Sequence, residues 1–92
     1  MRKGGYIYIL TNYRHTVLYV GVTSCLEKRL YEHNNGEVAS SSKYKPYEIL
    51  FYEVFTDLKL AKARELFYKT STGRYRLKKI VHQWKYAGRE TQ

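Results

Sequence analysis

Apolar runs along the chain predict three strands. Residues 6–11 (YIYILT) and 16–22 (TVLYVGV) are rich in β-branched and aromatic side chains, which favour strands. The segment 12–15 between them is polar and turn-like, so their close succession predicts a hairpin. Residues 47–55 alternate and run apolar, which predicts a third strand.

The predicted hairpin has a definite register. If its loop is the four residues 12–15, Thr11 pairs with Thr16. Counting back from that pair places Tyr8 opposite Tyr19, on the same face of the sheet. A loop longer by one residue would put the two tyrosines on opposite faces, because side chains alternate along a strand.

A first helix is predicted between two capping signals. Ser24 with Glu27 three positions later forms a capping box, and Gly36 is suited to closing a helix. The residues between these signals, 25–35, make about three turns. The segment 38–46 that follows is small, polar and basic, and it predicts an exposed loop.

Two further helices are predicted after the third strand. Asp57 can cap a helix over residues 58–69, and residues 70–73 (TSTG) end it and cap the next. In the last helix an apolar stripe comprises Leu77, Ile80, Val81 and Trp84. Trp84 is the expected core anchor of this stripe. The other face is basic and carries Arg74, Arg76, Lys78, Lys79, His82 and Lys85.

The predicted order is therefore β-β-α-β-α-α. This is a mixed α/β fold of the α+β type. A chain of 92 residues without a repeat or linker predicts one domain over residues 1–92. A sheet this small cannot cover itself, so we expect the helices to pack against it.

The charge balance indicates the kind of partner. Seventeen Lys and Arg against eight Asp and Glu give a formal charge of +9. Such a surface attracts polyanions, and nucleic acid is the usual partner. We expect Lys43 and Lys45 of the loop to contact it, together with the basic face of the last helix. An acidic membrane is the rival partner, but no amphipathic anchor or lipidation signal is evident, so no membrane binding is expected.

Cysteine usage and hydropathy indicate a cytoplasmic protein. Cys25 is the only cysteine in the sequence, so no internal disulfide can form, which suits a reducing compartment. The apolar run 6–10 is too short for a signal peptide, and no segment is long enough to span a bilayer. The three histidines lie too far apart for a local zinc pattern.

Arg29 and His33 are four residues apart and share a face of the first predicted helix. Arg presents a planar fork of donors that suits phosphate oxygens, and His can donate, accept or relay a proton near neutral pH. Taken alone, the pair is better explained by a solvated basic face, which is the commoner arrangement.

Glu65 shares the apolar face of the helix that follows the third strand, four residues after Ala61 and three before Tyr68. A carboxylate there needs a cation or a hydrogen-bond donor. A divalent metal would serve, because Mg²⁺ takes one carboxylate and completes its shell with water and phosphate. The alternative is a helical ion pair with Lys62 or Lys69.

One combination of spacings is more specific than any single residue. Segments 6–8 (YIY) and 19–21 (YVG) place Tyr8 and Tyr19 eleven residues apart, an arrangement that alone suits cross-strand packing. Gly21 leaves room beside its strand, and Arg29 and His33 follow it by eight and twelve residues. With these spacings the chain resembles the GIY-YIG nuclease family.

The resemblance covers residues 5 to about 80. The family places a later Glu where Glu65 stands, and the segment 72–79 (TGRYRLKK) is similar to the end of small stand-alone bacterial members. Tyr6 replaces the first Gly of the motif, although Gly5 stands one position earlier. Some members use a distal Asn, and nothing after Asn35 is Asn.

The resemblance implies a three-stranded antiparallel sheet flanked by helices and an endonuclease that hydrolyses DNA with one divalent ion, Mg²⁺ or Mn²⁺. It implies that Glu65 binds the metal and that Arg29 holds the scissile phosphate. Tyr8 is the expected general base, which requires nearby positive charge or a His relay because a Tyr hydroxyl titrates near 10. Tyr19 and His33 are expected to orient the water or accept its proton.

Gly21 is expected to be structural in the motif. Relatives with known targets carry a separate targeting domain, for which this chain has no room. It is expected to recognise DNA structure or ends, to cut with little preference, or to be recruited by a partner protein. A basic module that binds nucleic acid without cleaving it is the alternative, and RNA stays open as a substrate. Glu65 favours the nuclease, since a mere binder gains nothing from a carboxylate facing a polyanion.

Overall fold

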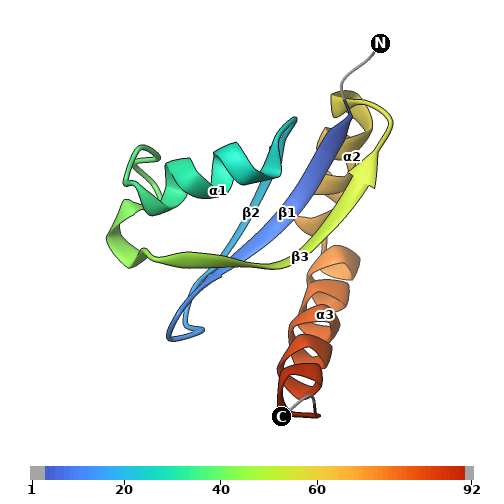
Figure 1. The fold of residues 1–92 in the computed structure, drawn as a ribbon. Helices are drawn as coiled ribbons and strands as arrows, with labels where there is room; N and C mark the ends of the chain where they lie inside the picture. The colour runs from blue at the N-terminus through green and yellow to red at the C-terminus, as the bar shows by residue number, and fades with distance from the viewer. Residues whose placement is uncertain (1–3, 91–92) are drawn as a thin grey trace.

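The elements follow the predicted order (Figure 1). The computed structural model describes residues 4–90, and the side chains of residues 4–85. Its elements are β1 (Gly5–Asn12), β2 (Leu18–Thr23), α1 (Leu26–Asn34), the short 3-10 helix η1 (Ser42–Tyr44), β3 (Tyr47–Phe55), α2 (Leu58–Tyr68) and α3 (Ser71–Glu90). The strands form one antiparallel sheet in the order β2-β1-β3. The predicted α+β fold is confirmed. Within the described residues, no helix is long and apolar enough to cross a membrane.

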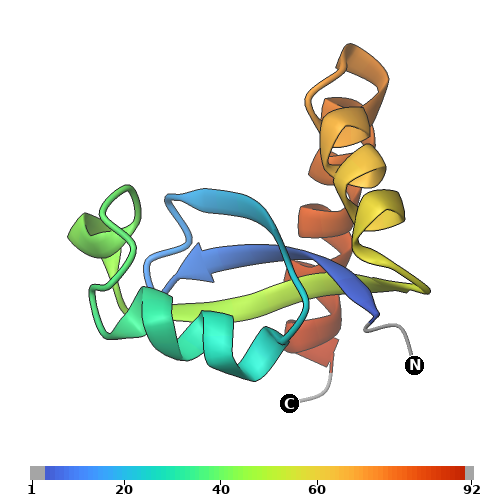
Figure 2. The ribbon, with the colours of Figure 1, turned by 90° about the horizontal axis from the view of Figure 1, so that it is seen from above.

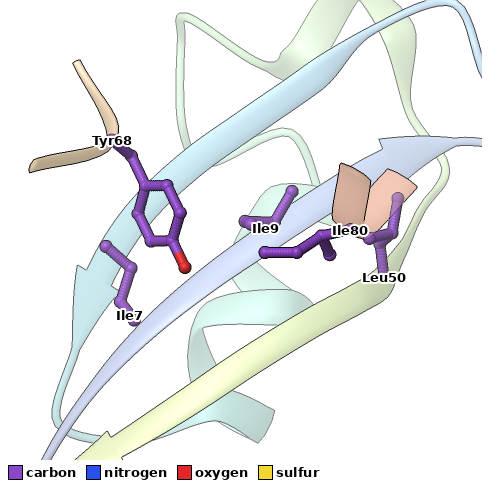
Figure 3. Close-up of a cluster of buried hydrophobic side chains, with 5 residues drawn as sticks. All are labelled: Ile7, Ile9, Leu50, Tyr68 and Ile80. Carbon is purple, nitrogen blue, oxygen red and sulfur yellow. The ribbon is translucent and has the colours of Figure 1, made fainter. Parts of the chain in front are cut away.

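The central strand β1 divides the molecule into two packed layers, because its side chains alternate. Ile7 and Ile9 are fully buried on the side of α2 and α3. Figure 3 shows this cluster, which comprises Ile7, Ile9, Leu50, Tyr68 and Ile80. Tyr8 and Leu10 belong to the other cluster, against which Leu26 and Leu30 of α1 pack. One strand therefore serves both the main core and the face under α1.

The hairpin register differs from the prediction by two residues. The observed pairs are Tyr8 with Gly21 and Leu10 with Tyr19. The cause is the side chain of Asn12, whose Oδ1 accepts hydrogen bonds from the backbone N–H groups of Thr16 (2.9 Å) and Val17 (3.0 Å) and stabilises a longer loop. A shift of two residues keeps every side chain on its face. Tyr8 and Tyr19 therefore share a face as predicted, but the prediction that they lie directly opposite was wrong.

The first helix begins at a different cap from the one predicted. The N-cap is Cys25, which makes no side-chain capping hydrogen bond, so the capping box at Ser24 was wrong. The Thr23 hydroxyl instead accepts from the Cys25 N–H at 3.1 Å. The C-terminal prediction is confirmed: Gly36 has a φ of +77°, where a residue without Cβ is favoured.

The loop at 38–46 is less exposed than predicted. Lys43 and Lys45 are exposed as expected, but Ser41 is buried, and the Tyr47 hydroxyl donates to its carbonyl oxygen at 2.8 Å. The loop lies at the end of the sheet away from α2 (Figure 1, Figure 2). A small polar segment resembles an exposed loop in sequence, because the partners that bury a serine are distant along the chain.

The last two helices begin at the predicted caps. Asp57 Oδ1 accepts from the Leu60 N–H at 3.0 Å at the start of α2. The Thr70 hydroxyl accepts from the Gly73 N–H, also at 3.0 Å, at the start of α3.

The apolar stripe of α3 faces the core, but its anchor is not the predicted one. Ile80 is buried, whereas Trp84 is half-buried at the margin of the cluster. There the Trp84 ring meets His15 of the hairpin loop edge to face, with 4.9 Å between ring centroids. Trp84 therefore joins the loop to α3, and Ile80 anchors the helix.

A stability prediction follows from the junction of α2 and α3. A methyl group on Gly73 would overlap the carbonyl oxygen of Phe67. Glycine to alanine ordinarily stabilises a helix by up to about 1 kcal/mol. Gly73→Ala should instead destabilise the fold by about 1–3 kcal/mol, because the backbone has to move. Urea unfolding followed by tryptophan fluorescence measures the change, with the exposed Thr72→Ala as control. A more stable Gly73→Ala protein would contradict the packing.

Candidate active site

Tyr8 is the centre of the candidate site. Its side chain is 2% exposed and lies across Gly21 of the neighbouring strand. A methyl group on Gly21 would overlap the Tyr8 hydroxyl. The room beside Gly21 is therefore occupied by the protein's own phenol.

The Tyr8 hydroxyl contacts two side chains of α1. Arg29 Nε donates to it at 3.3 Å, and His33 Nε2 lies 3.0 Å from it. Arg29 and His33 are one turn apart, and both reach the sheet. His33 is fully buried, so the alternative of a solvated basic pair was wrong.

Tyr19 reaches the same cluster from β2. Its ring meets His33 at a tilt, with 4.7 Å between centroids, and its hydroxyl lies 3.3 Å from Ser40 Oγ. The aromatic rings around His33 are those of Tyr8, Tyr19 and Tyr47. The imidazole is thus held on several sides by aromatic side chains.

Arg29 has a second partner in Glu32, to which its Nη1 donates at 3.2 Å. Within the described residues, no hydrogen bond uses Arg29 Nη2. The guanidinium is partly exposed, so it keeps a donor for an anion that approaches from solvent.

Ser41 is a site residue that the sequence reasoning missed. Its Oγ lies 2.6 Å from His33 Nδ1, and both residues are fully buried. No spacing rule connects a loop serine with a helical histidine. The available signal was chemical, since a buried imidazole needs a partner at each nitrogen.

Glu65 is half-buried on α2, on the face whose Ala61 and Tyr68 are buried. Burial is the main cause of the raised pKa of the Tyr8 hydroxyl, and the charge of the Glu65 carboxylate adds a smaller part of the rise. In the part of the chain that the structure describes, Glu65 makes no ion pair or hydrogen bond. The alternative pairs with Lys62 or Lys69 are therefore absent there.

Arg64, beside Glu65, ties α2 to the sheet. Its Nε and Nη2 donate to the two carboxylate oxygens of Glu53 on β3, at 2.9 and 3.3 Å. The Tyr68 hydroxyl donates to the same carboxylate at 2.9 Å. A bidentate pair limits the rotation of α2 about its axis, and so it also limits the direction in which Glu65 leaves the helix.

Burial sets the protonation states at the centre of the site. It raises the pKa of the Tyr8 hydroxyl, and the hydrogen bond and charge of Arg29 offset this only in part. Burial also lowers the pKa of His33, with a further lowering from Arg29 and an opposing contribution from Glu32. Near neutral pH the site therefore holds a protonated phenol beside a neutral imidazole.

The donor set suits a metal held by few protein ligands. No three His, Cys, Asp or Glu side chains of the described residues come together around one point. Glu65 alone offers one unpaired carboxylate near Tyr8. A hard divalent ion can be held by a single carboxylate, with other oxygen ligands such as water completing its shell.

The basic side chains singled out in the sequence are exposed, and no hydrogen bond or ion pair joins those of the described residues to Tyr8, Arg29 or His33. They are Arg74, Arg76, Lys78 and Lys79 on α3, and Lys43 and Lys45 in the loop. Lys79 Nζ lies 4.8 Å from the centroid of the Tyr75 ring, and Lys43 Nζ lies 5.5 Å from that of Tyr44. These pairs present positive charge beside exposed rings.

Comparison with known proteins identifies the family. Residues 4–88 match the GIY-YIG catalytic domain. UPF0213 proteins of Streptococcus pyogenes serotypes M3, M1 and M5 are 40% identical over 68 residues, which cover 73% of this chain and 73% of each relative. Their names state no activity, and no solved structure is significantly similar. The chain therefore belongs to the GIY-YIG family, whose catalytic domain is a nuclease domain.

Proposed function

We propose that the protein is an endonuclease that hydrolyses DNA phosphodiester bonds with one divalent ion. The observation that carries the proposal is the buried Tyr8 hydroxyl, held between Arg29 and His33 and under the electrostatic influence of Glu65. These residue types supply a proton acceptor, a relay, an anion contact and a metal ligand. A module that only binds nucleic acid has no use for such a cluster.

Tyr8 acts as the general base. It takes a proton from the attacking water while its own proton passes to His33, so the phenol is never required to carry a full negative charge alone. The 3.0 Å separation of Tyr8 Oη and His33 Nε2 allows this transfer directly. The lowered pKa of His33 keeps the imidazole neutral and able to accept.

Arg29 holds the scissile phosphate. Its Nη2 contacts a non-bridging oxygen, and the guanidinium stabilises the additional negative charge of the pentacovalent phosphate. Because Arg29 Nε also donates to Tyr8, the phosphate and the general base are placed by one side chain. Tyr19, beside His33, orients the attacking water.

Glu65 binds the metal ion, which is Mg²⁺ or Mn²⁺. Nucleases of this family generally depend on a divalent metal. When bound, the ion would polarise the phosphate, stabilise the leaving oxygen and put a positive charge where the carboxylate now raises the pKa of Tyr8.

The exposed basic side chains of α3 and the 38–46 loop neutralise DNA phosphates outside the reacting centre. We infer that the protein selects DNA by its structure or ends, is recruited by a partner protein, or cuts with little sequence preference. Contacts to phosphates position a protein on nucleic acid without specifying sequence.

The first test is Glu65→Gln. The change is nearly isosteric, but an amide is a much weaker ligand for a hard ion than a carboxylate. Cleavage of supercoiled plasmid with Mg²⁺ or Mn²⁺ should fall by orders of magnitude, while metal-free DNA affinity holds or rises. The exposed Glu27→Gln removes the same charge elsewhere and should cleave normally. Intact cleavage by folded Glu65→Gln protein would refute the metal site, and absence of cleavage by wild type would favour the binding module.

The second test is a double-mutant cycle on Tyr8 and Gly21. Gly21→Ala should displace the Tyr8 hydroxyl and lower the cleavage rate of the folded protein at least tenfold, and because the buried ring must move it should also destabilise the fold by about 1–3 kcal/mol. In a Tyr8→Phe background the same substitution should cost little further activity, because the group that it displaces is already gone. Additive losses in the two variants would mean that Gly21 acts on something other than Tyr8.

The third test is the pH dependence of stability. The pKa of His33 is lower in the folded protein than its unfolded value of about 6.5. The unfolded chain therefore binds more protons as pH falls through that value, so the free energy of unfolding should decrease from pH 7.5 to pH 5.5. His33→Gln should flatten the decrease. Equal slopes in wild type and His33→Gln would show that His33 is not the responsible group.

A further inference from the structure

We propose that Ser41 is a positioning residue that selects the tautomer of His33. Its hydroxyl keeps the proton of the neutral imidazole on Nδ1 and leaves Nε2 as an acceptor for the proton of Tyr8. The catalytic consequence rests on the function proposed above, but the tautomer itself does not.

Arg29 fixes the role of the Tyr8 oxygen, because a guanidinium N–H can only donate. Arg29 Nε donates to Tyr8 Oη at 3.3 Å, so the oxygen accepts there. The hydroxyl hydrogen of Tyr8 remains to be placed, and His33 Nε2 lies 3.0 Å away. If Tyr8 donates to His33, Nε2 must carry no hydrogen.

The contacts of Ser41, on the opposite side of the His33 ring from Tyr8, lead to the same tautomer. Ser41 Oγ lies 3.3 Å from the carbonyl oxygen of Val38, which can only accept, so the serine hydrogen points there. His33 Nδ1 lies 2.6 Å from the same Oγ. Because the serine hydrogen is already used, the hydrogen of that short contact must come from Nδ1.

The opposite tautomer leaves the site poorly satisfied. Ser41 would turn its hydroxyl hydrogen to His33, and the Val38 carbonyl would keep the Ser41 N–H but lose the hydroxyl as a donor. Nε2–H would then point at Tyr8 Oη, which already accepts from Arg29, and the hydrogen of Tyr8 would lose its acceptor. His33 and Ser41 are at most 1% exposed, so the imidazole and the serine hydroxyl find their hydrogen-bond partners within the protein.

The fold holds Ser41 in place from both sides. The Ser41 N–H donates to the Val38 carbonyl at 3.2 Å, and the Tyr47 hydroxyl donates to the Ser41 carbonyl at 2.8 Å. Asn34 of α1 in turn bonds the backbone N–H and carbonyl of Tyr47 at the start of β3. The 38–46 loop is therefore fastened to the helix that carries His33 and to the sheet, and it completes the site.

The charges near His33 do not themselves choose a tautomer. Arg29 lowers the pKa of His33 and Glu32 raises it. Both effects change the balance between protonated and neutral imidazole, not the balance between the two neutral tautomers. The other ionisable neighbours are the rings of Tyr8, Tyr19 and Tyr47. Among these groups and Ser41, only Ser41 contacts Nδ1.

The experiment combines nuclear magnetic resonance with cleavage kinetics on the full chain. Nitrogen-15 shifts of the His33 ring report which nitrogen bears the proton, in wild type and without any assumption about activity. We expect the Nδ1–H form in wild type and a shift toward Nε2–H in Ser41→Ala. Cleavage by Ser41→Ala should fall by about 10- to 100-fold, by analogy with the loss when the hydrogen-bond partner of a metal-ligating His is removed. The loss should appear in kcat more than in KM, with an altered acid limb of the pH–rate profile.

Two further variants separate positioning from general damage. Ser41→Thr keeps the hydroxyl and should retain the wild-type tautomer and most of the cleavage rate. Ser42→Ala removes a neighbouring hydroxyl that donates to the Ala39 carbonyl, and it should leave both readouts unchanged.

The possible outcomes are distinct. An Nε2–H tautomer in wild type, or an unchanged tautomer in Ser41→Ala, would overturn the assignment. The expected tautomers with equal cleavage by wild type and Ser41→Ala would overturn the positioning role. The expected tautomers in a wild-type protein that cleaves no DNA would overturn the proposed nuclease function and support the hydrogen-bond assignment.

Discussion

The packing of the Tyr8 phenol across Gly21 is the constraint on which the rest of the site depends. Only a residue without a side chain leaves enough room for the ring at this point of β2. Once the ring lies there, its hydroxyl meets Arg29 and His33, which α1 presents from successive turns. Burial then keeps the phenol protonated and the imidazole neutral, so their roles as donor and acceptor follow from position.

The site joins parts of the molecule that are fastened independently. The position of the His33 ring depends on α1 and on the loop at 38–46, whose Ser41 contacts the ring. The position of Glu65 depends on α2, which the ion pair between Arg64 and Glu53 attaches to β3. The strands serve both, since β1 carries Tyr8 and also the isoleucines of the main core. A change in how α1 or α2 packs on the sheet would therefore alter the spacing between His33 and Glu65.

Local sequence patterns predicted most of the architecture because they encode local physics. The third strand was predicted at its observed bounds, since alternation extends over its whole length, and Asp57 caps α2 as expected. The register failed because the Asn12 side chain bonds backbone groups four and five residues away and lengthens the loop, which no hydropathy pattern records. Ser41 was missed for a related reason: its burial depends on Tyr47 and His33, outside its own segment. The cluster of Tyr8, Arg29 and His33 was anticipated through the family resemblance, while each residue alone suited ordinary packing or solvation.

The ion pair between Arg29 and Glu32 bears on which anions the protein can retain. An anion arriving at Arg29 meets a guanidinium that is already half neutralised, so it must share or displace a carboxylate. A small independent anion has no other attachment from which to recover that cost. A phosphate within a polymer is held near Arg29 by its neighbouring phosphates. Its effective concentration there is high, so it can replace Glu32 at the guanidinium more readily. On the proposed function, the carboxylate would therefore favour a phosphate within a strand over a free phosphate ion.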